Sequence, residues 1–452
     1  MKKLIILSIA AVSLSGCGIY KKYDQTATVP ENLFGTVTAA SDTANIASLQ
    51  WEELFRDPAL QDLIRRGLEN NTDYRIAQLR IRQSEATLTA SRLSFLPSFA
   101  LAPQGGVSSF DGGKAVQTYT LPVSASWQVD LFGSLLNAKR EAKVALLQSE
   151  AYGQAVKTQV VASVANTYFT LLMLDSQYAI SCETQEKWKE SVRVAKALKQ
   201  AGMYTEAGVA QMEATYYSIC SSIEDLKEQI NQSENALALI LGETPHKITR
   251  GRLTDQQFPT TFGIGVPVEL LANRPDVKNA EQSVAGAFYT VAQARSAFYP
   301  SLVLSGTAGW TNNAGQMILN PGKLIASAVG SLTQPIFNNG KNKARLKIAK
   351  AQQEEARLSF HQTLLKAGGE VNNALTQYQT AQRKSEILSN QIRSLESAVR
   401  STNLMMVHGS TNYLEVLTAQ QTLLSARLTQ MANRFAEIQG IINLYQSLGG
   451  AR

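Results

Sequence analysis

The chain has 452 residues, of which 17% are charged and 44% are apolar or aromatic, and its formal net charge is +7. This length allows two or three globular domains. No run of about 18 consecutive apolar residues occurs, which excludes a membrane-spanning helix. The basic residues are scattered along the sequence rather than clustered with aromatic ones, so they indicate a solvated basic surface and no nucleic-acid binding.

Residues 1–16 have the pattern of an export signal, because two lysines precede eleven mostly apolar residues and then Ser15 and Gly16. The end of this segment, through Cys17, resembles the lipobox of bacterial lipoproteins. The resemblance implies cleavage before Cys17 and a lipid on its thiol; a conventional signal peptide is the alternative. Gly18 follows instead of Asp, which favours the outer membrane. Residues 17–50 are then a lipidated, extended segment, and a second membrane anchor is expected because one lipid chain binds weakly.

Two parts of the chain are similar to each other. Five residues return 203 positions later, namely Asp73, Ala77, Arg92, Pro97 and Ser98 as Asp276, Ala280, Arg295, Pro300 and Ser301. In each copy a helical stretch leads into a proline, two short alternating segments and a long proline-free stretch. A period of about 200 residues is too long for a solenoid unit and indicates a duplicated, domain-sized element.

Four segments are predicted to be strands: 97–107, 119–132, 300–310 and 324–336. In the second, Leu121, Val123 and Trp127 alternate with polar residues. This length and alternation are typical of transmembrane β-strands. Four strands cannot close in lipid, where open edges are not tolerated. Eight strands from two chains would make a barrel filled by side chains, so a conduit favours twelve strands from three chains.

The proline-free blocks 123–244 and 336–452 are predicted to contain long helices, of which the first begins at about residue 134. From Val209 to Ile240, and again from Leu414 to Tyr445, nine of ten positions spaced alternately by three and four are apolar or aromatic. The two series are offset by 205 positions, and a sustained period of about 3.5 indicates coiled-coil packing. Turns are predicted at Gly202 and Gly409. The polar remainder of these helices is either a solvated surface or the wall of an aqueous duct.

Cys182 and Cys220 lie on either side of the turn predicted at Gly202, with their midpoint at position 201. Equal distances from a turn would place them at similar height on two antiparallel helices. Export would carry them to an oxidising compartment, where disulfides can form. A disulfide and two buried free thiols are both open.

Three motifs resemble those of the TolC-like outer-membrane efflux proteins, particularly the lipoprotein branch that serves RND-type pumps (outer membrane factors similar to NodT and OprM). They are the opening segment from Trp51 to Leu60, the strand-to-helix junction from Trp127 to Gly133, and the sequence from Leu270 to Val277 with Arg274, Pro275 and Asp276 at its centre. The likeness covers residues 51 to 448. Pro275 also suits a first helical turn, where the charge of Asp276 complements the helix dipole.

The resemblance implies a mainly α protein with membrane β-structure: a long α-helical coiled-coil barrel, and four strands contributed to a trimeric transmembrane β-barrel. It divides the chain into a first repeat (51–242), an equatorial linker (243–266), a second repeat (267–448) and a tail (449–452). It also implies a homotrimer in the outer membrane whose helical part extends into the periplasm.

The resemblance further implies contacts to a periplasmic adaptor at the helix-turn tips, here Gly202, Met203, Tyr204, Gly409, Ser410 and Thr411.

In TolC a pair of carboxylates one turn apart narrows the pore. Glu415 matches the first of them, whereas Thr418 departs from the second and Thr411 stands where a basic partner is expected. A ring of three glutamates would still narrow the pore and favour cations. The alternative is that Glu415 only caps its helix.

No enzymatic motif is present, and the three histidines, His246, His361 and His408, are far apart. We therefore expect no enzyme, no metal site and no cofactor other than the lipid on Cys17. The predicted function is the exit duct of a tripartite efflux pump, which passively conducts small molecules such as drugs while an inner-membrane RND-type pump supplies the energy. The alternatives are the outer-membrane channel of a type I protein-secretion system and a non-conducting coiled-coil scaffold lipoprotein of the periplasm.

Overall fold

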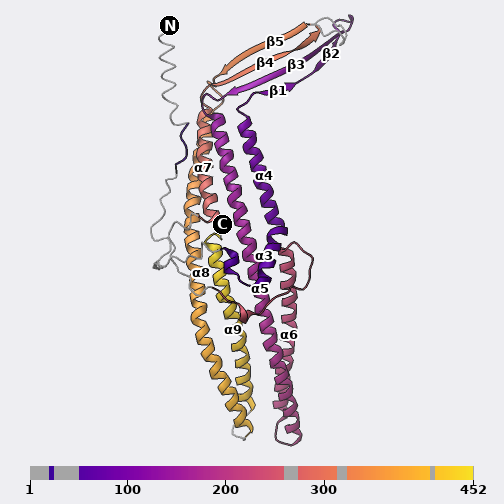
Figure 1. The fold of residues 1–452 in the computed structure, drawn as a ribbon, viewed down its shortest axis with the longest axis vertical. Coiled ribbons are helices and arrows are strands. Elements are labelled where there is room, and N and C mark those ends of the chain that lie inside the picture. Colours follow the sequence, from indigo (N-terminus) through magenta and orange to yellow (C-terminus); the bar gives the residue numbers. More distant parts are fainter. Residues whose placement is uncertain (1–19, 25–49, 259–272, 313–322, 408–412, 451–452) are drawn as a thin grey trace. The chain divides into compact units, whose positions relative to one another are not determined.

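The computed structural model describes residues 20–24, 50–258, 273–312, 323–407 and 413–450 (Figure 1). The chain forms two compact units, each assembled from three separate segments. The first unit contains residues 1–28, 79–151 and 278–363, and the second contains residues 29–78, 152–277 and 364–452. Among the described helices, none is both long and apolar enough to cross a membrane.

Helices dominate both copies of the duplication, and corresponding helices have the same length. There are 22 residues in α4 and α7, 67 in α5 and α8, and 35 in α6 and α9. The helices are α2 (Trp51–Leu54), α3 (Pro58–Asn70), α4 (Thr72–Leu93), α5 (Ser134–Gln200), α6 (Glu206–Ile240), η3 (Leu253–Asp255), α7 (Pro275–Ser296), α8 (Lys341–Val407) and α9 (Tyr413–Ser447). The two predicted long helical blocks are therefore two helical hairpins.

The spacing between the copies corrects the sequence analysis. The starts of α4 and α7 have the predicted offset of 203 positions, but α5 and α8, like α6 and α9, are offset by 207 positions at both ends. The offset of 205 positions read from the apolar series was therefore wrong, and the copies differ by four positions between the first helix and the long one. This difference lies in the strand hairpins and their connections.

The physical reason is that α9 has two contact faces. An offset of 207 positions carries the apolar series of α6 onto a series in α9 that includes Ala426, Asn433 and Gly440, and all three are buried. Asn433 donates a hydrogen bond to the carbonyl of Ala381 in α8 over 2.8 Å. A Cβ on Gly440 would lie 2.9 Å from the backbone nitrogen of Tyr378, so α8 approaches closely there. Hydrophobic periodicity detects the apolar face of α9 and misses this small and polar one.

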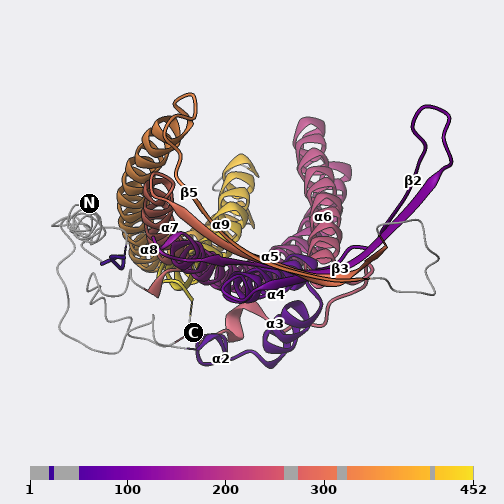
Figure 2. The same cartoon turned by 90° about the horizontal axis from the view of Figure 1, so that it is seen from above.

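One antiparallel sheet contains all described strands, and it lies in the first unit. Its strands are β1 (Ser98–Leu101), β2 (Gln104–Ser108), β3 (Val116–Val129), β4 (Ser301–Asn312) and β5 (Lys323–Thr333). The order is β1, β3, β4, β5, and β2 pairs with β3 beyond β1. Because β1 and β2 are consecutive along β3, the sheet has four strand positions, as predicted, and the first position is interrupted at Ala102 and Pro103. Figure 2 shows β3 and β5 as long ribbons of the same sheet, and β4 pairs with both of them.

The register gives the sheet one apolar face and one hydroxyl-rich face, since directly paired residues point to the same side. One row across the strands is Leu101, Val123, Ala308 and Ala326, and the adjacent row is Ala100, Ser124, Thr307 and Ser327. In the second row the hydroxyls of Thr307 and Ser327 are 2.6 Å apart and hydrogen bonded. The predicted alternation of apolar and polar faces is confirmed.

The helices of the first unit pack together through polar contacts between neighbours. Ser84 of α4 bonds Ser149 of α5 over 2.7 Å, and Gln148 of α5 bonds Ser283 of α7 over 2.9 Å. The amide of Asn342 in α8 donates to the carbonyl of Ala297 after α7 over 2.6 Å. These bonds hold the ends of α4 and α7 beside the beginnings of α5 and α8.

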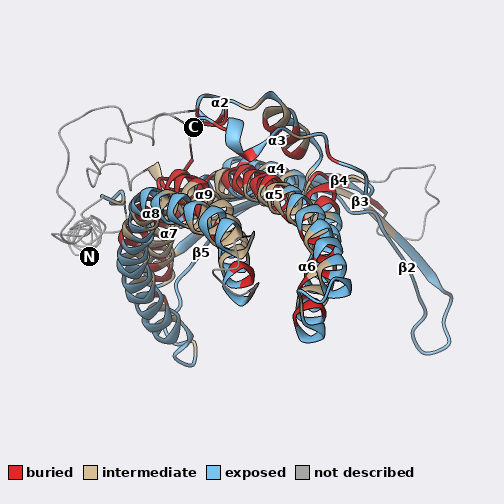
Figure 3. Ribbon diagram, turned by 90° about the horizontal axis from the view of Figure 1, so that it is seen from below, coloured by how far each residue is buried: buried red, intermediate tan, exposed pale blue. Residues whose placement is uncertain are grey.

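The main hydrophobic core lies in the second unit. It contains Trp51, Leu54 and Phe55 from the opening segment, together with residues of α3, α5, α6, α8 and α9. In Figure 3 buried residues gather on α5, α9 and the short helices α2 and α3. Asp57 begins α3 by accepting a hydrogen bond from the backbone of Ala59 over 2.9 Å, with Pro58 in the first helical position. The Trp51–Leu60 motif is thus explained by packing and capping.

Candidate functional site

The tip between α5 and α6 is the turn at positions 201–205. Gly202 has φ of +74°, a left-handed conformation that favours glycine. Met203 is 70% exposed, whereas the hydroxyl of Tyr204 contacts the sulfur of Met212 at 3.3 Å. Thr205 caps α6 by accepting a hydrogen bond from the backbone of Gly208 over 3.1 Å. The predicted turn at Gly202 is confirmed, and its apolar tip residue is Met203.

The tip between α8 and α9 is described only at its helices. Gly409, Ser410 and Thr411 lie outside the described residues. Glu415 is exposed in the first turn of α9, where a negative charge is favourable. The hydroxyl of Thr418 donates to the carbonyl of Leu414 over 2.8 Å, so it is engaged within its own helix. Whether Glu415 narrows a pore stays a prediction at this point.

A cavity of about 150 Å³ lies between the ends of the two helical hairpins. Its lining joins Tyr204 and Met212 from the first hairpin with Met406 and Leu417 from the second. Beside it, Trp188 of α5 is fully buried and packs with Ile219, Ile223 and Leu417. No sequence pattern indicated Trp188, because α5 lacks the regular heptad that would mark it as a core residue.

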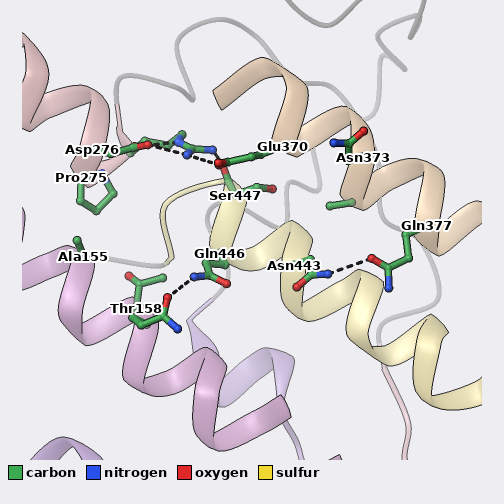
Figure 4. A pocket seen from close by; sticks show the side chains of 13 residues that line it. Ala155, Thr158, Pro275, Asp276, Glu370, Asn373, Gln377, Asn443, Gln446 and Ser447 are labelled. Atoms are coloured by element: carbon green, nitrogen blue, oxygen red, sulfur yellow. Dashed lines mark hydrogen bonds and ion pairs between the residues drawn. The ribbon is translucent and has the colours of Figure 1, made fainter. Parts of the chain in front are cut away.

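The Arg274–Pro275–Asp276 motif forms an ionic cluster, which Figure 4 shows from close by. The guanidinium of Arg274 donates to both carboxylate oxygens of Asp276 at 2.9 and 2.7 Å, and to Glu370 of α8 at 2.6 Å. It also donates to the carbonyl of Ser447, the last residue of α9, over 2.7 Å. Arg274 is buried, with 5% of its surface exposed. Through these hydrogen bonds it connects the beginning of α7 to α8 and to the end of α9.

The electrostatics of this cluster favour the charged forms. Burial by itself would lower the pKa of Arg274, but hydrogen bonds to Asp276 and Glu370 raise it above its ordinary value. Burial likewise would raise the pKa of Asp276, and the hydrogen bonds and charge of Arg274 outweigh it, so that this pKa is lowered. Pro275 and Asp276 stand at the start of α7, as predicted. Glu370 and Ser447 are partners that no sequence pattern indicated.

A cavity of about 440 Å³ adjoins this cluster. Five carboxamide side chains are among its lining residues, and Asn443 donates to Gln377 over 3.0 Å within it (Figure 4). The carboxamides are Gln159, Asn373, Gln377, Asn443 and Gln446. They lie within the second unit, on α5, α8 and α9.

The first repeat has a neutral counterpart of this cluster. Asn71 precedes α4 directly, as Arg274 precedes α7, and its amide donates to the carbonyl of Ile240, the last residue of α6, over 2.8 Å. Its side-chain oxygen accepts a hydrogen bond from the backbone of Tyr74 over 3.0 Å. In each repeat, the residue before the first helix thus holds the end of the last helix. Aligning the two repeats at this position would have found Asn71 from the sequence.

The described part of the predicted linker, residues 243–258, is fixed by a second polar network. Arg250 forms hydrogen bonds and ion pairs with Asp175 of α5 and Glu234 of α6. These bonds, the one to Asp175 above all, raise the pKa of Arg250. The hydroxyl of Tyr168 donates to Asp57 over 2.6 Å. The pKa of Tyr168 is raised, mainly by burial and next by this hydrogen bond. The linker is therefore attached to both helices of the first hairpin.

Of the two alternatives left open for Cys182 and Cys220, the structure contains free thiols, and both are half-buried. Because α5 ends at Gln200 and α6 begins at Glu206, Cys182 is further along its helix from the turn than Cys220 is. At a rise of about 1.5 Å per residue, the two differ by about 6 Å in height. Gln185 is within one residue of the level of Cys220, and its amide contacts the sulfur at 3.1 Å. The turn is centred on Met203, beyond the midpoint that the disulfide requires.

Cys17 lies outside the described residues, whereas Tyr20, three residues later, is described. The hydroxyl of Tyr20 donates to the carbonyl of Leu131, and Arg140 donates to the carbonyls of Tyr20 and Lys21. Within the described part of the chain, no group of three or more His, Cys, Asp or Glu side chains could hold a metal ion.

The profile of the outer membrane efflux protein family matches residues 63–243 and 266–450. The chain belongs to this family. It is 27% identical to the cation efflux system protein CusC of Escherichia coli, with 97% of each chain covered, and 27% identical to the toluene efflux pump outer membrane protein TtgC of Pseudomonas putida, with 99% of this chain and 96% of TtgC covered. It is also 26% identical to SilC of Salmonella typhimurium, named a probable outer membrane lipoprotein, over 100% of this chain and 99% of SilC.

The fold agrees with this membership. A crystal structure of CusC superposes with a TM-score of 0.85 at 25% identity and covers 95% of this chain and 99% of that one. The mainly α fold with a membrane-associated sheet is therefore confirmed, and so is the resemblance that its motifs indicated. The protein is an outer-membrane efflux protein that serves as an exit duct, as predicted.

Proposed function

We propose that three copies of this chain form one continuous duct that passively conducts small molecules, such as drugs, from the periplasm to the exterior. The duct belongs to a tripartite pump in which an RND-type protein of the inner membrane supplies the energy and a periplasmic adaptor makes the connection. A lipid on Cys17 adds an anchor beside the barrel. The relatives TtgC and CusC are named for toluene and cation efflux, which supports small solutes as the substrate class.

The sheet carries this proposal. Within the described chain its outer strand positions, β1–β2 and β5, each pair on one side only. One face is apolar and the other carries Ser and Thr, as expected of strands between lipid and water. A strand edge in lipid must be paired, so neighbouring copies have to supply the missing partners. Three copies give twelve strands, enough to enclose water, whereas eight strands enclose side chains.

Adjacent residues of β5 provide the test. Ser327 belongs to the hydroxyl-rich row and Ala326 to the apolar row. We expect Ser327→Lys to assemble as a trimer in light scattering and to shift the selectivity of planar-bilayer conductance toward anions. Ala326→Lys should lower membrane insertion, because lysine facing the middle of the bilayer costs about 2–4 kcal/mol. A monomeric or non-conducting wild type, or identical behaviour of the two variants, would contradict the duct.

The gate is a second part of the proposal. Glu415 is exposed at the start of α9, and three copies would place three carboxylates at one level. We expect Glu415→Gln to raise the leak conductance and to reduce the preference for cations. Thr418→Ala is the matched control, since that hydroxyl is bound within its own helix. Unchanged conductance in Glu415→Gln would leave Glu415 with helix capping alone.

The adaptor contact is proposed at both tips, which include Gly202, Met203 and Tyr204 in the first hairpin. Met203 is 70% exposed and gives this tip an apolar surface. We expect Met203→Lys to conduct normally in bilayers but to fail in restoring drug resistance to a strain that lacks the chain. Normal restoration would exclude Met203 from the contact.

For the lipid on Cys17, we expect that the variant Cys17→Ser no longer incorporates radiolabelled palmitate.

A further inference from the structure

The fold gathers basic residues that are scattered along the sequence. We define the junction belt as residues 20–24, 92–97, 130–143, 295–300 and 334–350, which connect the sheet to the helices of the first unit. The belt contains twelve basic and three acidic residues, a net charge of +9. The whole chain has a net charge of +7, so all of its other residues together carry −2. The excess of positive charge is therefore concentrated in the junction belt.

Ten of the twelve basic side chains of the belt are exposed, all except Lys139 and Arg140. The beginning of α8 alone contributes five, and all five are exposed, namely Lys341, Lys343, Arg345, Lys347 and Lys350. None of them forms an ion pair with a residue that the structure describes. Arg92 and Arg295, which correspond in the two repeats, are exposed in the last turns of α4 and α7.

Two of the three acidic residues of the belt are occupied elsewhere. Asp130 accepts hydrogen bonds from the backbone of Leu135 and Leu136 at 3.1 and 2.8 Å and so caps α5. Glu141 accepts hydrogen bonds from Thr290 and Gln293 of α7. Both α5 and α8 begin without an acidic residue in their first turn. Basic residues there oppose the helix dipole, so their charge requires a favourable partner outside the helix.

The surroundings of the belt indicate what that partner is. No charged residue occurs in β1, β2, β3 or β4, and three strand ends border the belt directly, since β1 begins at Ser98, β3 ends at Val129 and β4 begins at Ser301. Aromatic residues accompany the basic ones: Phe132 stacks on Tyr299 with ring centres 4.9 Å apart, and Lys139 lies 5.7 Å from the ring of Phe95. An uncharged sheet bordered by aromatic and basic residues is typical of a membrane–water interface. Figure 1 shows the helix ends meeting the strands at this level of the first unit.

The N-terminal segment gives an independent indication. Tyr20 is bound to Leu131 in the belt, and the proposed lipidated residue, Cys17, is three residues before it. Three residues span at most about 11 Å. An acyl chain on Cys17 would therefore enter the membrane close to the belt. Neighbouring copies cannot neutralise the belt, because a closed ring places the same basic surface of each copy at one level.

We propose that the junction belt binds the headgroups of anionic phospholipids in the periplasmic leaflet of the outer membrane. The inference rests on the proposed function, since it takes the sheet to be the membrane-spanning part. The basic side chains hold phosphate groups by charge and hydrogen bonds, and the aromatic residues lie at the level of the glycerol backbone. The belt thereby fixes the depth of the duct in the membrane, in addition to the anchoring by the barrel and by the lipid on Cys17.

The test uses the full chain in mixed micelles that contain phosphatidylglycerol or phosphatidylcholine, with retained lipids counted by native mass spectrometry. The belt variant replaces all five basic residues of α8 by Gln: Lys341, Lys343, Arg345, Lys347 and Lys350. The control variant replaces five exposed basic residues of the second unit by Gln: Lys187, Lys189, Lys366, Lys384 and Arg400. Glutamine has a helix propensity similar to that of Lys and Arg, so we expect both variants to keep their helix content in circular dichroism.

We expect wild type and control to prefer phosphatidylglycerol and the belt variant to lose at least about tenfold of this preference. Equal preference in all three proteins, or equal loss in both variants, would overturn the proposal. Displacement of the lipid by millimolar inorganic phosphate at physiological salt would also overturn it, in favour of a simple phosphate site. Conductance of the same preparations is recorded separately. A conducting wild type without lipid preference refutes the belt alone, whereas lipid preference without conductance refutes the duct alone.

Discussion

Asn71 in the first repeat and Arg274 in the second stand at corresponding positions and bind corresponding carbonyls, those of Ile240 and Ser447. Asn71 does so with a neutral amide that also caps its own helix. Arg274 does so with a buried guanidinium held by two carboxylates. The duplicated helices thus need their ends fixed in both repeats, but the chemistry that fixes them was free to diverge. Arg274 also binds Glu370 of α8. Within the described residues, Asn71 makes no corresponding hydrogen bond to α5, the helix of the first repeat that corresponds to α8.

Removing the guanidinium should have the largest effect on stability. Arg274→Met keeps the aliphatic stem but leaves Asp276, Glu370 and the Ser447 carbonyl without their donor. Both carboxylates are about half exposed, so solvent screens part of the loss. We expect a destabilisation of about 2–3 kcal/mol in urea unfolding of the detergent-solubilised protein. Arg357→Ala breaks an exposed pair with Glu354 and should cost less than about 0.5 kcal/mol. Equal losses in both variants would show that the cluster contributes no more than a surface pair.

A second difference between the repeats lies at Gly440, which corresponds to Ser233 in α6. Because a Cβ at Gly440 would meet the backbone of Tyr378, Gly440→Ala should push α9 away from α8 and cost about 2 kcal/mol. Ser233→Ala should change stability by no more than about 0.5 kcal/mol. A tolerated alanine at Gly440 would mean that α8 and α9 are not held as closely as the structure shows.

The neutral contact should be weaker than the ionic one. Asn71→Ala removes the donor to Ile240 and the cap on Tyr74, and we expect a loss of about 1–2 kcal/mol in the same unfolding experiment. Asn71→Asp keeps the cap, removes the donor and adds a negative charge near the Ile240 carbonyl, so its loss sets an upper limit on the contribution of the donor. A loss in Asn71→Ala as large as that of Arg274→Met would invalidate the contrast between the repeats.

The smallest expected effect is a change of pH dependence. The pKa of Asp276 is lowered in the folded protein from an ordinary value of 3.8, so its ion pair stabilises the fold above that pH and loses this contribution as the pH falls below it. Asp276→Asn should therefore be less stable than wild type at neutral pH, and the difference should shrink below about pH 4. Urea midpoints at pH 7 and pH 3 measure this. A difference that does not change with pH would assign the effect to lost hydrogen bonds alone.

Much of this architecture could be predicted from residue patterns. The proline-free blocks, the turn at Gly202, the four strand positions and the start of α7 at Pro275 were all predicted, because they depend on local backbone chemistry and on alternation. The offset of the apolar series was wrong, and the disulfide left open for Cys182 and Cys220 is not formed, for a common reason. Both required heights along two packed helices, and a shift of a few positions changes no local pattern but moves a side chain by several ångströms.

By itself the sequence determined which segments are helices and strands, that two repeats exist, and which family the chain belongs to. Only the tertiary structure decided which residues meet. Glu370 and Ser447 reach Arg274 from helices about 100 and 170 positions away, and the five chain segments of the junction belt join into one basic surface at the helix ends. Basic residues from separate segments form one patch only where strands and helices bring those segments together. No local sequence pattern shows which distant segments will be neighbours in the fold.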